Sequence, residues 1–232
     1  MAKKDTIALA LDNISDLTAL TDLITATKDS VGVYKIGFEQ FIRFGPSILE
    51  PVRAQGSKIF LDMKLHDIPN TVAKAVTSAS ELGVDYLTLH AIGGLPMLTA
   101  AAEAAAKALN APKLIGVTVL TSVDQACMNN DMRIAGGVEE QVVHLAKIAQ
   151  QSGIDGIVCS AADLPTVKPT LPSSFEIITP GIRPAGVDAG DQKRIATPVD
   201  AINNGATLLV IGRAITGAVD PAKAAADILA SL

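Results

Sequence analysis

The chain has 232 residues, of which 49% are hydrophobic and 19% are charged, and its formal net charge at pH 7 is −5. The negative charge and the low aromatic content (3%, with no Trp) argue against a nucleic-acid-binding surface, which needs basic patches and stacking rings. No apolar stretch approaches the roughly 18 to 20 residues of a membrane span, and the opening MAKKDTIALALDN has too short an apolar run for a secretory signal.

Eight short β-rich segments recur along the chain. Several are nearly continuous runs of Val, Ile and Leu, which is typical of parallel strands that are buried on both faces. The segments are TIALALD (6–12), VGVYKIG (31–37), SKIFLDMKL (57–65), DYLTLHA (85–91), KLIGVTVL (113–120), DGIVCS (155–160), FEIITPGI (175–182) and TLLVIGRAI (207–215).

Helix-like segments fall between these strands. The first, at 14–28, carries its apolar residues at helical spacing and has Ser15 or Asp16 as its N-cap. The next has Pro69 near its start and Gly83 where a helix would end. The remaining predicted helices are 95–110, 137–153, 161–168, 197–205 and 220–232.

The alternation of eight strands with helices predicts an α/β fold of the (β/α)₈ or TIM barrel type. The length suits one hydrophobic core, and no linker or change in composition divides the chain. We therefore expect a single catalytic domain over residues 1–232. A doubly wound open sheet is the alternative, and the count of eight favours the barrel.

Polar residues gather where the predicted strands end, and in a barrel these ends meet at the active-site mouth. They are Asp12, Lys35, Asp62, Lys64, His90, Thr121, Ser122, Ser160, Arg183, Gly212 and Arg213.

Asp62 and Lys64 are two apart on a strand, so they point to the same face and can meet Asp12 and Lys35. A structural ion-pair network is the plain interpretation, but burying this many charges is costly without a function. Carboxylates favour the ammonium form of a neighbouring lysine, which suits it to donate a proton to a carbanion. Repulsion of a substrate carboxylate beside such a lysine indicates a decarboxylation.

A phosphate site is predicted at the last two strands. GIRPAG (181–186) and VIGRAIT (210–216) each place a Gly beside an Arg, and barrels often bind phosphate with these loops. Arg183 and Arg213 would supply charge-assisted hydrogen bonds. The Gly-rich segment 184–194 is either a surface loop or a lid that closes Arg183 and Gln192 over the ligand.

With these residues assembled, the sequence resembles the bacterial orotidine 5′-phosphate decarboxylases. Their signature Asp-x-Lys-x-x-Asp is DMKLHD at 62–67, followed by IPNT, and the likeness continues from ALALD to LLVIGRAIT. The resemblance implies conversion of orotidine 5′-phosphate (OMP) to uridine 5′-phosphate (UMP) in pyrimidine biosynthesis, without a metal or an organic cofactor.

The resemblance also implies a role for each matched residue. Lys64 protonates C6 of the pyrimidine, Asp62 lies against the substrate carboxylate, and Lys35 with Asp12 binds the ribose hydroxyls. A homodimer partner supplies Asp67, which completes a catalytic Lys-Asp-Lys-Asp array with Lys35, Asp62 and Lys64, and Ile68 and Thr71 also reach across. The matched positions that contact the pyrimidine or the phosphate are Thr121, Ser122, Arg183, Gln192, Gly212 and Arg213.

Other interpretations stay open. Magnesium-dependent keto-gulonate-phosphate decarboxylases and hexulose-phosphate synthases share the signature, but they carry an acidic metal ligand where this chain has Lys35. A catalytically dead barrel would be expected to lack Lys64 or an aspartate. His66, His90 and His144 are not expected to be catalytic, and Cys127 and Cys159 fit plain thiols in a reducing, cytoplasmic compartment.

Overall fold

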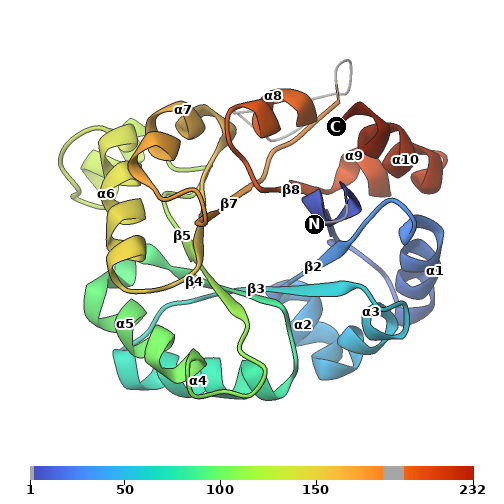
Figure 1. The fold of residues 1–232 in the computed structure, drawn as a ribbon, viewed down its shortest axis with the longest axis horizontal. Helices are drawn as coiled ribbons and strands as arrows, with labels where there is room; N and C mark the ends of the chain where they lie inside the picture. The colour runs from blue at the N-terminus through green and yellow to red at the C-terminus, as the bar shows by residue number, and fades with distance from the viewer. Residues whose placement is uncertain (1–2, 185–195) are drawn as a thin grey trace.

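The computed structural model describes residues 3–184 and 196–232. Eight parallel strands close into a barrel in the order β1 to β8, each paired with its neighbours in the sequence, and β1 pairs with β8. Helices surround the ring of strands (Figure 1). The predicted (β/α)₈ barrel is therefore confirmed. The strands are β1 (Ile7–Ala10), β2 (Val33–Gly37), β3 (Lys58–Leu65), β4 (Tyr86–His90), β5 (Lys113–Val117), β6 (Gly156–Val158), β7 (Glu176–Thr179) and β8 (Leu208–Ile211).

The helices follow the predicted order with two corrections. They are α1 (Leu17–Thr27), α2 (Phe38–Phe44), α3 (Glu50–Ala54), α4 (Pro69–Glu81), α5 (Gly94–Ala105), α6 (Val138–Gln151), α7 (Leu164–Val167), α8 (Pro198–Asn203), α9 (Arg213–Thr216) and α10 (Pro221–Ser231). No helix was predicted between β2 and β3, where α2 and α3 lie. The eighth strand was predicted to reach 215, but it ends at Ile211 and α9 begins at Arg213.

Helix ends follow from local chemistry. The Asp16 side chain accepts a hydrogen bond from the Ala19 N–H and caps α1, as one of the two proposed caps. Pro69 opens α4, where its missing N–H costs no hydrogen bond, and Gly83 follows the helix with φ +62°. No helix in the described part of the chain is long and apolar enough to cross a membrane.

Two apolar cores flank the strands. The larger one fills the space between barrel and helices, and a smaller one lies inside the barrel and includes Val33, Phe60 and Tyr86. Side chains two residues apart on a strand share a face. Positions two residues further along β2, β3 and β4 therefore also face the interior, and there the apolar filling gives way to polar side chains.

The opposite, N-terminal end of the barrel carries its own polar cluster. Glu176 at the start of β7 is 8% exposed, pairs with Lys113 and accepts a hydrogen bond from Thr207 at 2.7 Å. Lys58 pairs with Asp5 at 2.9 Å. These pairs neutralise charges at the end of the barrel away from the predicted site, where residues are expected to contribute to stability.

Candidate active site

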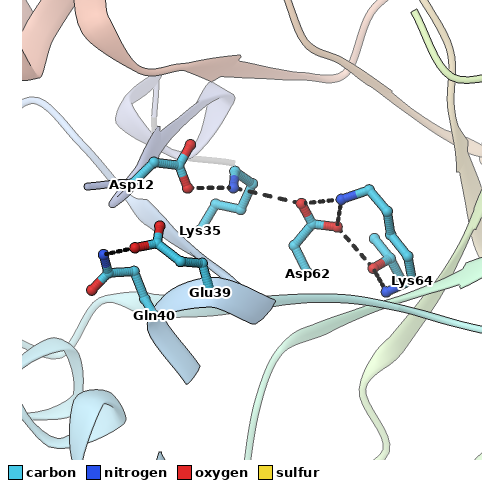
Figure 2. A network of polar contacts seen from close by, with 7 residues as sticks. Asp12, Lys35, Glu39, Gln40, Asp62 and Lys64 are labelled. Atoms are coloured by element: carbon cyan, nitrogen blue, oxygen red, sulfur yellow. Dashed lines mark hydrogen bonds and ion pairs between the residues drawn. The ribbon is translucent and has the colours of Figure 1, made fainter. Parts of the chain in front are cut away.

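Four charged side chains form a continuous array at the C-terminal end of the first three strands (Figure 2). The Lys35 ammonium lies 3.2 Å from Asp12 Oδ1 and 3.5 Å from Asp62 Oδ2. The Lys64 ammonium donates to both carboxylate oxygens of Asp62, at 2.9 and 2.8 Å. The array therefore alternates in sign from Asp12 through Lys35 and Asp62 to Lys64, and the sequence predicted that these four side chains meet.

Asp62 is the buried centre of the array, with 8% of its surface exposed. Burial alone would raise the pKa of its carboxyl, but the ammonium groups of Lys35 and Lys64, with hydrogen bonds from Lys64 and Thr88, hold the pKa below its ordinary value. Asp62 is therefore ionised at neutral pH although it lies inside the barrel. A second carboxylate brought against it would be strongly repelled.

The backbone of β3 departs from regular strand geometry at Lys64. Leu61 pairs with Leu87 and Leu65 pairs with Leu89, so four steps along β3 match only two along β4. Lys64 has φ +49°, a left-handed conformation that costs energy for a residue with a side chain. Strain of this kind is often found at functional sites, and here it lies on the lysine of the array.

Asp12 follows β1 on a segment that is held from α2. Asn13 takes a left-handed conformation with φ +58°. The side-chain oxygen of the buried Gln40 accepts hydrogen bonds from the N–H groups of Asn13 at 3.3 Å and Ile14 at 3.0 Å, and Arg43 donates to the Ile14 carbonyl at 3.3 Å. The unpredicted helix α2 thus fixes the turn that presents Asp12 to Lys35.

Two adjoining hollows open onto the array. A cleft of about 700 Å³ runs from Asp12 and Lys35 to Arg183 and Arg213. A smaller cavity of about 190 Å³ is lined by residues that include Asp62, Lys64, Thr121 and Ser160. Lys35, Pro180 and Val210 line both hollows. The two charged ends predicted from the sequence therefore belong to one continuous depression.

The arginine end of the cleft has one buried and one exposed cation. Arg183 is 7% exposed, and its Nη1 donates to the Ile182 carbonyl at 2.9 Å. Burial, and then the nearby Arg213, lower the pKa of the Arg183 guanidinium from its ordinary value. Arg213 is the first residue of α9 and is exposed, and Gly212 precedes it at the cleft wall. Two guanidinium groups that repel each other across an open cleft favour an anion between them.

Of the remaining predicted pyrimidine and phosphate contacts, only part can be placed at the two hollows. Thr121 lines the smaller cavity, whereas Ser122 is exposed and is not part of that lining. Gln192, with residues 185–194 of the predicted lid, lies outside the described residues.

Asp67, Ile68 and Thr71 are exposed and lie beyond the strand end, on the rim. The Asp67 side chain accepts a hydrogen bond from the backbone N–H of Ile68 at 2.6 Å. The ion pairs of the array join Asp12, Lys35, Asp62 and Lys64 and do not include Asp67.

The histidines lie beside the array. The rings of His66 and His90 are 5.8 Å apart, and burial, followed by the charges of His66 and Lys64, lowers the pKa of His90. Among residues 3–184 and 196–232, no group of three or more His, Cys, Asp or Glu side chains could hold a metal ion. Cys159 is buried and burial raises its pKa, so it is a poor nucleophile.

Comparison with known proteins places this site in a family. Residues 5–228 match the model of the orotidine 5′-phosphate decarboxylase / HUMPS family. The chain is 45% identical over 237 residues to the orotidine 5′-phosphate decarboxylase of Moorella thermoacetica, covering 100% of this chain and 94% of the relative. It is 47% identical over 222 residues to that of Nitrosococcus oceani, covering 96% and 95%.

The chain belongs to the orotidine 5′-phosphate decarboxylase / HUMPS family. Solved structures agree with this assignment. The orotidine 5′-phosphate decarboxylase of Lactobacillus acidophilus superposes with a TM-score of 0.84 at 35% identity, over 97% of each chain. An uncharacterised conserved protein from Geobacillus kaustophilus gives 0.81 at 32% identity, over 96% of this chain and 97% of that one.

Two residues around this family's site were missed by sequence reasoning. Gln40 lies in a helix that was not predicted, so its contact with the Asp12 segment could not be foreseen. Thr88 interrupts the apolar pattern of β4 at an inward position, and that interruption was the available signal. It contacts both Asp62 and the Lys64 backbone.

Proposed function

We propose that this protein decarboxylates orotidine 5′-phosphate to uridine 5′-phosphate, and that it uses its own charged side chains without a metal or an organic cofactor. The observation that carries the proposal is the Lys64 ammonium bound to both oxygens of the buried Asp62, at 2.9 and 2.8 Å. This pair adjoins a cleft with two arginines at its far end, and relatives 45 to 47% identical are orotidine 5′-phosphate decarboxylases.

The chemistry follows from the charges. The substrate carboxylate on C6 lies against Asp62, and repulsion between the two anions raises the energy of the bound ground state. The bond between C6 and the carboxylate carbon breaks, carbon dioxide leaves, and the electron pair stays on C6. The Lys64 ammonium stabilises this carbanion and then transfers a proton to C6, which gives the uracil ring. The lysine recovers its proton from solvent.

The rest of the substrate fits the adjoining cleft. Lys35 and Asp12, joined at 3.2 Å, bind the ribose hydroxyls between the two hollows. Arg183, Gly212 and Arg213 hold the phosphate by charge-assisted hydrogen bonds, together with Gln192. Thr121 and Ser122 contact the pyrimidine. Binding energy at the phosphate end then offsets the repulsion at the carboxylate.

A homodimer completes the site in this proposal. Asp67, Ile68 and Thr71 reach across to the site of the other chain, where Asp67 adds a carboxylate next to Lys64. Large exposed apolar side chains follow three neighbouring strands around the same rim, which is typical of an interaction surface. They are Phe38, Ile42, Ile68, Ile92 and Leu95.

The metal-dependent members of the barrel group are the alternative. In those enzymes an acidic metal ligand stands in the position of Lys35. Here the Lys35 ammonium is 3.5 Å from Asp62, and Lys64 is bound to the same carboxylate. Two ammonium groups around one carboxylate disfavour a divalent cation there, because the carboxylate charge is already balanced.

The direct test is the ultraviolet absorbance of OMP mixed with purified protein in excess chelator. We expect conversion to UMP at an unchanged rate when the chelator is added. A folded protein that leaves OMP intact, but converts a sugar phosphate once magnesium is supplied, would move the protein to the metal-dependent branch.

A further inference from the structure

Thr88 lies between the two principal groups of the array. It is in β4 with none of its surface exposed. Its hydroxyl donates to Asp62 Oδ1 at 2.9 Å and accepts from the Lys64 backbone N–H at 2.8 Å. The direction of each bond is fixed, because a carboxylate can only accept and a backbone N–H can only donate. One hydroxyl therefore joins the side chain of Asp62 to the main chain of Lys64.

The second of these bonds lies at the irregular part of β3. Between the pairs Leu61–Leu87 and Leu65–Leu89, β3 has more residues than β4, so the Lys64 N–H lacks a regular ladder partner. The Thr88 hydroxyl takes that place. Lys64 is also in the strained left-handed region, and strain of this kind persists only when its surroundings hold it.

The geometry points to Thr88 as a positioning residue, which holds the backbone of Lys64 and the carboxylate of Asp62 in the relative placement that the decarboxylation needs. This inference rests on the proposed function. It adds a residue that touches neither hollow and acts only through Asp62 and Lys64.

Three variants separate this role from general packing. Thr88→Val keeps the shape and removes the hydroxyl, and Thr88→Ser keeps the hydroxyl. The matched control is Thr118→Val, because Thr118 is also buried (4% exposed) and its hydroxyl donates to the Val158 carbonyl at 2.8 Å. That bond lies at the end of the adjacent strand and makes no contact with the charged array. Each variant is assayed for kcat and KM with OMP, and for its midpoint of urea unfolding.

We expect Thr88→Val to lower kcat by about 10- to 100-fold, the effect of losing a hydrogen bond to a charged group, while KM changes by less than about threefold. Thr88→Ser should restore most of kcat. Thr118→Val should match Thr88→Val in its unfolding midpoint and keep the wild-type kcat. Equal kcat values for both valine variants, with equal midpoints, would overturn the positioning role.

A second readout does not depend on turnover. In protein carrying ¹³C at the aspartate carboxyls, the Asp62 signal is assigned from its loss in Asp62→Asn. We expect this signal to titrate at higher pH in Thr88→Val than in wild type and Thr118→Val. An unchanged titration would contradict the inference. If wild type fails to convert OMP, the proposed function is wrong, and the titration still decides whether Thr88 organises the array.

Discussion

Replacement of Asp62 by Asn tests whether the buried carboxylate holds the array together. In the wild type this carboxylate accepts hydrogen bonds from Lys64 and Thr88 and lies 3.5 Å from the Lys35 ammonium. The amide of Asn is neutral, and its NH₂ group would face an ammonium group. Lys35, whose side chain is 11% exposed, would keep only Asp12 as an ionic partner among residues 3–184 and 196–232.

The size of the effect follows from burial. Removing one member of a buried ion pair costs about 3 to 5 kcal/mol because the other charge is left uncompensated. The Lys64 side chain is 28% exposed and can turn toward water, which reduces the cost. We therefore expect Asp62→Asn to lower the free energy of unfolding at pH 7 by about 2 to 3 kcal/mol, near the lower limit for such a pair.

Urea unfolding followed by far-ultraviolet circular dichroism measures this change, since the chain has no Trp for fluorescence. The ammonium groups of Lys35 and Lys64 hold the Asp62 pKa below its ordinary value in the folded protein, so its stabilisation is fully present above the unfolded pKa and is lost as the pH falls through the folded pKa. The difference between wild type and Asp62→Asn should shrink accordingly in acid. Asp227→Asn, in an exposed i,i+4 pair with Lys223, is the control and should leave the midpoint unchanged. An Asp62→Asn protein as stable as wild type at pH 7 would refute the reasoning.

Three further outcomes are expected. We expect the Asp67→Ala and Lys64→Ala proteins, each inactive alone, to recover activity when mixed, because a mixed dimer restores one intact site. No recovery despite demonstrated subunit exchange would argue against shared sites. Arg183→Ala should lower kcat/KM for OMP by about 100-fold or more, since a charge-assisted contact is worth about 1.5 to 3 kcal/mol or more when bidentate. Turnover of orotidine, which lacks the phosphate, should be unchanged. Equal losses on both substrates would disprove the phosphate role. Glu176→Gln should destabilise the fold by about 1 to 2 kcal/mol through its bonds with Lys113 and Thr207, with KM unchanged, and an altered KM would contradict its purely structural placement.

The order of strands could be predicted because each is a short, dense apolar run, and burial on both faces requires that pattern. The meeting of Asp62 and Lys64 could be predicted because both lie near the end of one strand. Regular alternation is not what brings them together, since β3 is irregular between Leu61 and Leu65 and Lys64 has φ +49°. Helices α2 and α3 were missed because they have only seven and five residues, which is too short to show helical periodicity. Gly45 and Pro46 also interrupt the stretch between them. The eighth strand was predicted too long because apolar residues follow Arg213. In the structure these residues belong to α9.

Details of the site depend on contacts between distant residues. The left-handed backbone of Lys64 is supported by Thr88, which is 24 positions away, and the Asp12 segment by Gln40, which is 26 positions from Ile14. Local sequence does not identify the partner in either pairing, although Thr88 stands out as a polar residue in the apolar run of β4. The family resemblance gave roles to residues of the rim, such as Asp67, that no pattern within one chain could assign.

The central claim is that the Lys64 ammonium protonates C6. The most direct measurement is the turnover of OMP by Lys64→Ala, beside Lys74→Ala, which removes an exposed lysine from α4. We expect Lys64→Ala to lose turnover while it stays folded and still binds UMP, with its free energy of unfolding lowered by no more than about 2 to 3 kcal/mol because Lys35 still lies beside Asp62. Lys74→Ala should behave as wild type. Near-normal turnover by Lys64→Ala would contradict the account.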